Sequence, residues 1–228
     1  MEPIALGLNR VRARLAAALA SAGRAPDSAR LIAVSKFHPA SAIRAAYAEG
    51  QRDFGENYVQ ELEQKAAELS DLSDLRWHMI GHLQRNKARS VTPLVSLIHT
   101  VHSLELAREL DKRATTPLSV LVEVNVGGEA QKSGCPPEAL SALLLALGQA
   151  ERLRCRGLMC VPPHTEDPSG ARPYFEQLRA LRDAHGGAER LPELSMGMTA
   201  DLEYAIAAGA SIVRVGTAIF GERPRAER

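Results

Sequence analysis

The chain has 228 residues, of which 45% are hydrophobic and 24% are charged, and its formal net charge is +1 at pH 7. That length fits one large domain or two small ones, and the composition is ordinary for a soluble globular protein. The small net charge argues against nucleic acid or an anionic membrane as the main partner, and no apolar stretch approaches the ~20 residues of a membrane span. The three cysteines, Cys135, Cys155 and Cys160, form no CxxC pair, which indicates free thiols in a reducing compartment and therefore a cytoplasmic protein.

The N-terminal segment has the apolar spacing of an amphipathic helix. Ile4, Leu8, Val11, Leu15 and Leu19 follow one another at three or four residues, which places them on one helix face. The nearby arginines give the segment a superficial likeness to a transit peptide. The regular spacing favours a packed helix instead.

After this helix, short apolar runs alternate with longer helical patterns. The predicted strands are 31–36, a short one that ends near Gly55, 76–80, 97–101, 118–126, 154–161, 192–196 and 211–215. The predicted helices between them include 39–49, 58–69, 103–114, 136–149, 170–185 and 199–208. Such alternation specifies a parallel sheet. A doubly wound sheet has the same pattern, but eight strands favour an α/β fold with a single (β/α)₈ barrel domain over residues 1–228 and an extra N-terminal helix.

Lys36 closes the first predicted strand, which begins at Leu31. A charge at the end of a buried strand is desolvated, and this is unfavourable unless the charge is used. A desolvated lysine amine is a nucleophile that forms a Schiff base with carbonyl substrates or with pyridoxal phosphate. The alternative is a strand-end lysine that extends its amine into water.

Polar or glycine-rich residues follow almost every predicted strand. They are Lys36, Gly55–Tyr58, Gly81–Lys87, His102–Ser103, Glu123 with Asn125, Gly157, Ser195–Thr199 and Arg214–Thr217. In barrels of this class the active site collects at the C-terminal ends of the strands. These residues are therefore expected to surround one mouth of the barrel.

The last two of these segments, Ser195–Thr199 and Arg214–Thr217, have features of an anion-binding site. Thr199 is predicted to cap a helix that begins near Ala200, and the turn at Gly216 and Thr217 offers backbone N–H groups. Simple helix capping is the alternative role of Thr199. Barrels often bind phosphate after strands seven and eight. Together with Lys36, such a phosphate site describes a pocket for pyridoxal phosphate.

Arg214 and Asn57 fit that pocket. A guanidinium is always charged and has no acceptor, so Arg214 facing a pyridine nitrogen keeps this nitrogen unprotonated and weakens the ring as an electron sink. An ion pair on the barrel rim is its alternative role. Asn57 either contacts the ring or caps a turn.

Other chemistries have less support. His78 and His82 are four residues apart, but they flank Gly81 at a strand end and lack the glutamate of a metalloprotease helix, so no metal site is expected. No serine lies in a G-x-S-x-G motif, which argues against a hydrolase triad.

Six motifs, in this order, resemble those of the pyridoxal phosphate homeostasis proteins. They are Ala33–Lys36, Phe54–Glu61, Trp77–Lys87, Gly157–Met159, Leu194–Met198 and Val213–Gly221. The resemblance runs from about residue 4 to Gly221, nearly the whole chain.

The resemblance implies the barrel of the alanine racemase N-terminal domain, with Lys36 as the Schiff-base lysine. It also implies phosphate contacts from Ser195–Thr199 and Gly216–Thr217, and Arg214 at the pyridine nitrogen. Family members bind pyridoxal 5′-phosphate and buffer or deliver it, with apo-enzymes as transient partners, and are not established as catalysts. One mild departure is Cys160, where a small or hydroxyl residue is usual; its thiol is expected to be an oxidation liability.

A small amino-acid racemase is the alternative to a non-catalytic carrier. A two-base racemase needs a second proton donor opposite the lysine, which resembling racemases take from an added C-terminal domain. This chain ends seven residues after Gly221, and only Tyr58 among its tyrosines follows a mouth motif. We therefore expect a carrier, and a monomer because the dimerising domain is absent. A Schiff-base aldolase would leave Asn57 and Arg214 without a task. Lys132 either accepts the aldehyde during transfer or is an ordinary surface lysine.

Overall fold

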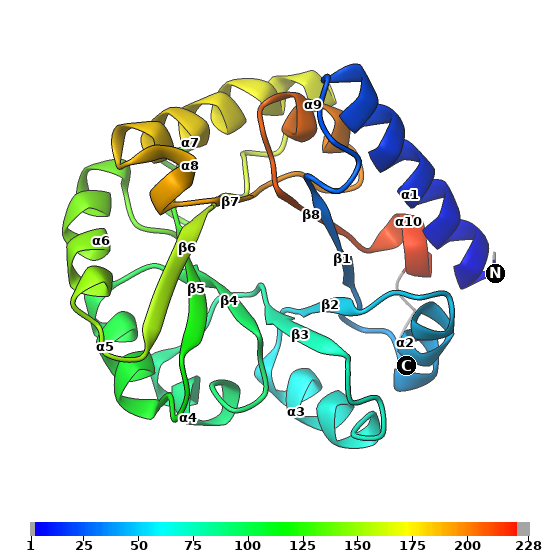
Figure 1. Cartoon of the computed structure of the whole chain (residues 1–228), viewed down its shortest axis with the longest axis horizontal. Coiled ribbons are helices and arrows are strands. Elements are labelled where there is room, and N and C mark those ends of the chain that lie inside the picture. The colour runs from blue at the N-terminus through cyan, green and yellow to red at the C-terminus, as the bar shows by residue number, and fades with distance from the viewer. Residues whose placement is uncertain (1–2, 223–228) are drawn as a thin grey trace.

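Eight short parallel strands pair in chain order, and β8 pairs with β1, so that the sheet closes into a barrel (Figure 1). The computed structural model describes residues 3–222. The strands are β1 (Arg30–Val34), β2 (Asp53–Glu56), β3 (Arg76–Met79), β4 (Leu97–Val101), β5 (Leu118–Glu123), β6 (Leu153–Met159), β7 (Glu193–Ser195) and β8 (Ile212–Val215). The predicted (β/α)₈ barrel is confirmed, and closure excludes the doubly wound sheet.

Helices surround the strands on the outside (Figure 1). They are α1 (Ile4–Ser21), α2 (Ala40–Ala48), α3 (Val59–Glu68), α4 (Ala88–Val91), α5 (Leu104–Arg113), α6 (Leu140–Gly148), α7 (Arg172–Ala184), α8 (Gly187–Arg190), α9 (Leu202–Ala207) and α10 (Thr217–Phe220). Short 3₁₀ turns occupy Arg85–Lys87, Pro137–Ala139 and Pro168–Ala171. Within residues 3–222, no helix has both the length and the apolar character needed to cross a membrane.

The N-terminal helix α1 is present as predicted and packs beside α9 and α10 (Figure 1). Its inward face buries Leu8, Val11 and Leu19, each worth about 1.5–3 kcal/mol when removed from water. Gly7 permits the close contact with α10, because a Cβ there would lie 2.8 Å from the Ala218 carbonyl oxygen. The helix therefore covers the seam where β8 meets β1.

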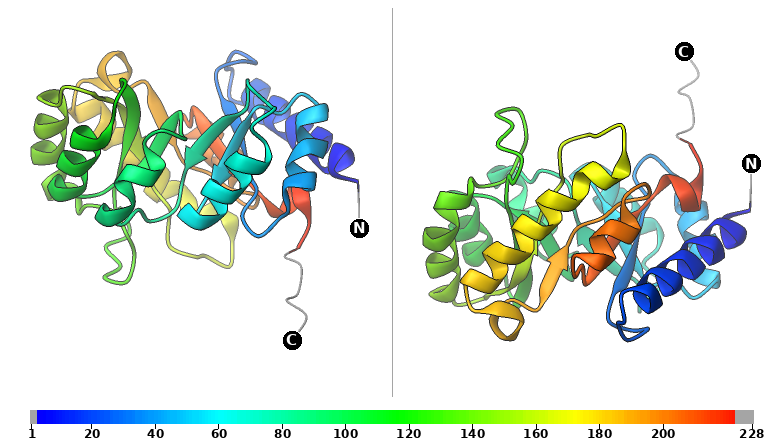
Figure 2. Two further views of the ribbon diagram at one scale, coloured as in Figure 1. Left: turned by 90° about the horizontal axis from the view of Figure 1, so that it is seen from below. Right: turned by 90° about the horizontal axis from the view of Figure 1, so that it is seen from above.

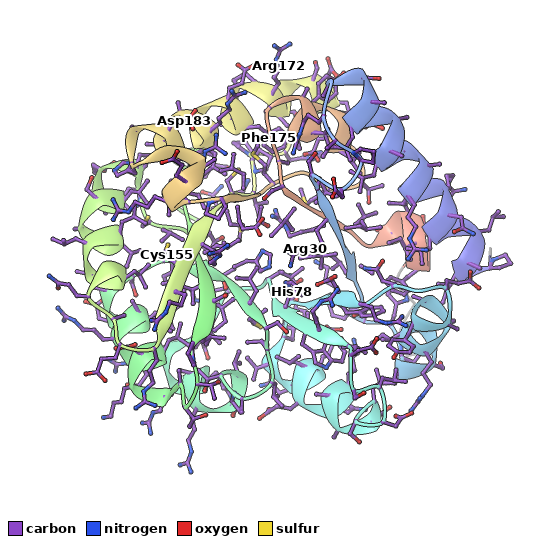
Figure 3. The ribbon with its side chains drawn as sticks, viewed as in Figure 1. Arg30, His78, Cys155, Arg172, Phe175 and Asp183 are labelled. Atoms are coloured by element: carbon purple, nitrogen blue, oxygen red, sulfur yellow. The ribbon has the colours of Figure 1, made fainter. Side chains whose placement is uncertain are left out.

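Side chains fill the barrel interior. A small apolar cluster lies at its centre, formed by Ile32, Leu97, Leu121, Met159 and Ile212. Polar side chains share this interior with the cluster. Figure 3 shows one of them, the buried His78, near the centre of the barrel and close to Arg30, whose side chain is exposed. The barrel is thus a packed core and not a pore.

The structure corrects several predicted boundaries. β5 ends at Glu123 and not at residue 126, because the chain turns there and Cys135 donates its N–H to the Glu123 carbonyl at 2.8 Å. The prediction that Thr199 caps a helix is wrong. Asp201 is the residue before α9, and its carboxylate accepts the Met198 N–H at 2.6 Å. The helices α4, α8 and α10 were not predicted, since four residues are too few for a helical period to be visible in the sequence.

Candidate functional site

A cavity of about 270 Å³ opens at the C-terminal ends of the strands. It is lined by Val34, Lys36, Asn57, Ile80, Val161, Met198, Thr199, Arg214, Gly216 and Thr217. The size is near the lower limit of small-molecule sites, which span about 300–1,000 Å³. The loops after β5 and β6 project on one side of the barrel (Figure 2).

The structure brings six of the seven predicted site residues to this cavity. They are Lys36, Asn57, Thr199, Arg214, Gly216 and Thr217. The seventh, Ser195, is fully buried and its hydroxyl bonds to Arg214 from within the barrel. These residues come from the ends of β1, β2, β7 and β8, so strand closure is what assembles them.

Backbone groups on both sides of Lys36 are held in place. The Ser35 carbonyl accepts a hydrogen bond from Lys65 Nζ at 2.8 Å, and the Phe37 N–H donates to Glu61 Oε2 at 2.8 Å. Phe37 has a φ of 66°, a left-handed conformation that is unfavourable for a residue with a large side chain. The surrounding bonds thus maintain a strained turn directly after the lysine.

These bonds belong to a compact group that we call the lateral cluster: Ser35, Glu56, Glu61 and Lys65. Lys65 Nζ contacts Glu56 Oε1 at 2.7 Å and Glu61 Oε2 at 2.8 Å, and the Ser35 hydroxyl donates to Glu56 Oε1 at 2.7 Å. Burial raises the pKa of Glu56, and the hydrogen bonds from Lys65 and Ser35 partly oppose this rise. The cluster lies between β2 and α3, outside the barrel wall.

Arg214 lines the cavity from the inside of the barrel. Its Nη1 donates to Ser195 Oγ at 2.5 Å and its Nη2 to the Cys160 carbonyl at 2.9 Å. Since a guanidinium carries five N–H donors, these two bonds leave others to face the cavity. Burial lowers the pKa of Arg214, but a guanidinium stays charged at neutral pH.

Glu123 is a second buried ionisable group near Arg214. Burial raises the pKa of its carboxyl to about 7, and the positive charge of Arg214 opposes this rise. Its Oε2 atom is buried and has no hydrogen-bond partner in the described part of the chain. From the sequence, Glu123 is predicted only as one of the polar groups at the strand ends.

Asn57 presents an unsatisfied acceptor. Its Oδ1 is buried without a hydrogen-bond partner among residues 3–222, although the side chain lines the cavity. Gly81 permits this placement, because a Cβ at that position would lie 2.1 Å from the Asn57 carbonyl oxygen. Buried polar atoms are normally paired, so an unpaired one beside a cavity suits a bound donor.

The turn at Gly216 and Thr217 supplies backbone donors at the opposite side. Thr217 begins α10, and the first N–H groups of a helix have no partner inside that helix. Gly216 lies close to β1, since a Cβ there would be 3.0 Å from the Val34 carbonyl oxygen. An amine, a cation and such a turn around one small cavity are typical of a site for a small anionic compound with a reactive carbonyl group.

Beneath Arg214 lies a second polar network, which we call the axial chain: Asp53, His78, His99, Ser195 and Arg214. Its members are linked by hydrogen bonds of 2.5–3.0 Å across the barrel interior. No sequence motif marks this network. Only the alternation of inward-facing residues along β2, β3 and β4 indicates that polar side chains point into the barrel.

Three further predictions can be compared with the structure. The Cys160 thiol is fully buried and burial raises its pKa to about 12, so the expected oxidation liability is wrong: the reactive thiolate does not form near neutral pH. Lys132 does not line the cavity; its Nζ donates to the Pro162 carbonyl at 2.9 Å and pairs with Glu129. It ties the loop after β5 to the loop after β6. The three cysteines are free, as predicted.

Comparison with known proteins places these features in a family. A family profile described as the alanine racemase N-terminal domain matches residues 7–224. A pyridoxal phosphate homeostasis protein from Pseudomonas aeruginosa is 47% identical over 98% of this chain and 97% of its own length. An unknown protein from Bifidobacterium adolescentis has a crystal structure with a TM-score of 0.89 at 40% identity, covering 96% of this chain and 94% of that one. The structure of PipY from Synechococcus elongatus with PLP bound has a TM-score of 0.78 at 41% identity, covering 91% and 100%.

The barrel has the architecture of the alanine racemase N-terminal domain. Within that class, the chain belongs to the family of pyridoxal phosphate homeostasis proteins, because the matches extend over nearly all of both sequences. The resemblance inferred from the six motifs is thereby confirmed.

Proposed function

We propose that this protein binds pyridoxal 5′-phosphate in the mouth cavity, holds it as a Schiff base on Lys36, and acts in intracellular homeostasis of the cofactor by buffering and delivering it. The observation that carries the proposal is that Lys36, Arg214 and the Gly216–Thr217 turn line one small cavity. The PLP-bound PipY structure and the names of the relatives support it.

The residues present fit the cofactor. Arg214 lines the cavity and would donate to the pyridine nitrogen, and the unpaired Oδ1 of Asn57 would accept from a donor on the bound molecule. Thr199 and the Gly216–Thr217 turn line the same cavity and would hold the phosphate. Ser195 would act through Arg214, which its hydroxyl contacts.

The chemistry required of the chain is limited. The Lys36 amine forms a C=N bond with the aldehyde carbon, and the aldehyde oxygen leaves as water. A bound pyridoxal phosphate supplies a reversible store of reactive aldehyde. Arg214, which cannot give a proton away at neutral pH, would keep the ring nitrogen unprotonated and so disfavour carbanion chemistry.

A racemase using the same lysine is the second candidate, and the position of Tyr58 does not favour it. Tyr58 is exposed and packs against Phe37, with ring centroids 5.3 Å apart, and among the described residues no tyrosine lines the cavity. A second proton donor opposite Lys36 is therefore not provided by a tyrosine of this part of the chain.

The protein's compartment and partners can be proposed from its thiols and its charge. Free cysteines suit a reducing compartment, and we propose a cytoplasmic monomer that meets apo-enzymes transiently. A net charge of +1 gives no support for nucleic acid as a partner.

The test is the visible absorption spectrum of the protein with added pyridoxal phosphate, compared with Lys36→Ala and with Lys132→Ala as a matched loop lysine. We expect an imine band that is lost only in Lys36→Ala, and a borohydride-reduced adduct that peptide mass mapping assigns to Lys36. An adduct spread over surface lysines would overturn the proposal. Incubation with alanine in deuterated water separates the two candidates, because a racemase exchanges the α-hydrogen and a carrier does not.

A further inference from the structure

The axial chain crosses the barrel from its N-terminal end to the cavity. Asp53 Oδ1 lies 3.0 Å from His78 Nε2, and His78 Nδ1 lies 3.0 Å from His99 Nε2. His99 Nδ1 lies 2.8 Å from Ser195 Oγ, which accepts from Arg214 Nη1 at 2.5 Å. Five strands, β2, β3, β4, β7 and β8, each contribute one residue.

The axial chain is closed to water. His99 and Ser195 have no exposed surface, and the other three members are at most 5% exposed. Burial lowers the pKa of His99 well below its usual value. Burial also lowers the pKa of His78, and the Asp53 carboxylate partly opposes this decrease. Both imidazoles are therefore neutral, and each carries a single N–H.

The Arg214 end is compatible with one continuous order of the protons. Arginine only donates, so Ser195 Oγ accepts from Arg214, and in this order it directs its own hydrogen to His99 Nδ1. His99 then carries its proton on Nε2 and donates it to His78 Nδ1. This leaves His78 with its proton on Nε2, facing Asp53.

The Asp53 end fixes this order. Burial alone would raise the pKa of Asp53, but hydrogen bonds from Arg76 and His78 hold it well below its usual range, so the group is an acceptor. His78 donates to it from Nε2 and accepts at Nδ1, which requires the donor on His99 Nε2. The Asp53 carboxylate and the two neutral rings thus impose one arrangement, in which every bond points from the cation to the anion.

We propose that the axial chain is a proton-ordered device that positions the Arg214 guanidinium from the far end of the barrel. The ordered bonds present an acceptor lone pair of Ser195 to Arg214 at all times, and they link the orientation of the guanidinium to the charge on Asp53. For its effect on the cofactor, the inference rests on the proposed function. Asp53, His78, His99 and Ser195 are positioning residues, since they act through Arg214.

Three other groups bear on the same guanidinium and are not part of the axial chain. The Cys160 carbonyl accepts from Nη2, and the carboxyls of Glu123 and Asp201 interact with Arg214 through their charges. None of them fixes which side of Ser195 faces Nη1. The axial chain is the element that does so.

The first test uses the unmodified protein without cofactor. ¹⁵N-labelled histidine spectra should show His78 and His99 as neutral rings that carry hydrogen on Nε2 and accept at Nδ1, with no titration between about pH 5.5 and 8. A proton on Nδ1 of either ring, or a titration near the ordinary pKa of about 6.5, would overturn the proton order. This measurement stands whether or not the cofactor binds.

The second test compares Asp53→Asn with Glu193→Gln. Both change a carboxylate that contacts Arg30 at the N-terminal end of the barrel, but only Asp53 belongs to the axial chain. We expect Asp53→Asn to weaken pyridoxal phosphate binding about three- to thirtyfold and to shift the ¹⁵N signal of the labelled pyridine nitrogen. Glu193→Gln should leave both within about twofold of the unmodified protein.

Unchanged binding and an unchanged ring signal in Asp53→Asn, or equal effects of the two variants, would overturn the positioning role. Asp53→Asn also removes an ion pair with Arg76, so its folding is checked by near-UV circular dichroism. If it does not fold, Ser195→Ala takes its place in the comparison. Failure of the unmodified protein to bind pyridoxal phosphate would refute the proposed function, while the histidine spectra would still decide the proton order.

Discussion

The lateral cluster and the axial chain are both buried polar networks beside the cavity, but they handle charge in different ways. In the lateral cluster the charges touch: Lys65 contacts Glu56 at 2.7 Å and Glu61 at 2.8 Å. In the axial chain the charges stand at the two ends, and three neutral groups separate Arg214 from Asp53. One network depends on direct ion pairing, and the other on the orientation of neutral donors.

The two networks should respond differently to the loss of one side chain. The lateral cluster has two carboxylates for one ammonium, and the Oε2 atom of Glu56 has no hydrogen-bond partner within the described residues. Loss of Lys65 would therefore leave a buried negative charge. The axial chain is balanced, and any break in it would leave unsatisfied donors or acceptors instead. The following predictions separate these two cases.

The largest effect is expected for Lys65→Met. Removal of one partner of a buried ion pair is unfavourable by about 3–5 kcal/mol, because the other charge stays buried and uncompensated. The free energy of unfolding, measured in urea, should fall by this amount, and the loss should grow with pH because Glu56 takes up a proton at low pH. Lys112→Met, an exposed lysine on α5, is the control and should change little.

The double variant Glu56→Leu/Lys65→Met separates the effect on stability from the effect on the turn around Lys36. Replacement of both partners by apolar side chains is often nearly neutral for stability, so most of the loss should be recovered. If the lateral cluster positions the turn around Lys36, imine formation should be slower in the double variant than in the unmodified protein, although its stability is restored. Imine formation at the unmodified rate would limit the cluster to a role in folding.

A smaller loss is expected for Ser195→Ala. The change leaves Arg214 Nη1 and His99 Nδ1 without this partner, which is unfavourable by about 2–4 kcal/mol because one of them is charged. Urea unfolding measures the loss, and the ¹⁵N signal of His99 Nδ1 should move away from its hydrogen-bonded position. A stable variant with an unaltered His99 signal would contradict the arrangement of the axial chain.

Glu123→Gln tests the pH dependence of stability. The folded protein holds the Glu123 proton up to a pKa of about 7, whereas the unfolded chain releases it near the ordinary value of about 4.3. The contribution of this group to the free energy of unfolding is therefore full below about pH 4.3 and is lost as the pH rises to about 7. Glu123→Gln should remove this decrease in the free energy of unfolding with rising pH. At pH 8 the variant should be more stable than the unmodified protein by about 1–3 kcal/mol. Parallel pH profiles of the two proteins would contradict it.

The smallest effect is expected for Glu61→Gln. The amide oxygen can still accept from Lys65 and from the Phe37 N–H, so the free energy of unfolding should change by about 1 kcal/mol or less. Glu61→Ala removes both bonds and should slow imine formation at Lys36. Equal rates in the two variants would show that Glu61 does not hold the strained turn.

The sequence was sufficient to predict the barrel and most of the cavity. Strand ends are marked by motifs, and the closed sheet brings all of these ends to one mouth, so Lys36, Asn57, Arg214 and the turn at Gly216 could be inferred to lie together. Their predicted roles toward the cofactor remain predictions.

The axial chain could not be predicted, because it depends on which residues face one another across the barrel. His78 lies beside Gly55 in the register of β2 and β3, but its hydrogen-bond partners come from β2 and β4, at positions fixed by strand tilt and stagger. Ser195 was expected among the phosphate contacts because its motif is adjacent to Thr199. The strand ends at Ser195, and its side chain points into the barrel while the following residues reach the cavity.

The packed interior of the barrel closes the floor of the cavity. Ile32, Leu121 and Met159 fill the barrel interior with no exposed surface, so a cofactor held in the cavity would enter and leave at the mouth, where the side chains of Met198 and Val161 are exposed. Under the proposed function, loading and unloading then compete for the same entrance. A recipient enzyme docked over the mouth would exclude fresh cofactor, so that delivery and refilling would proceed as alternating events.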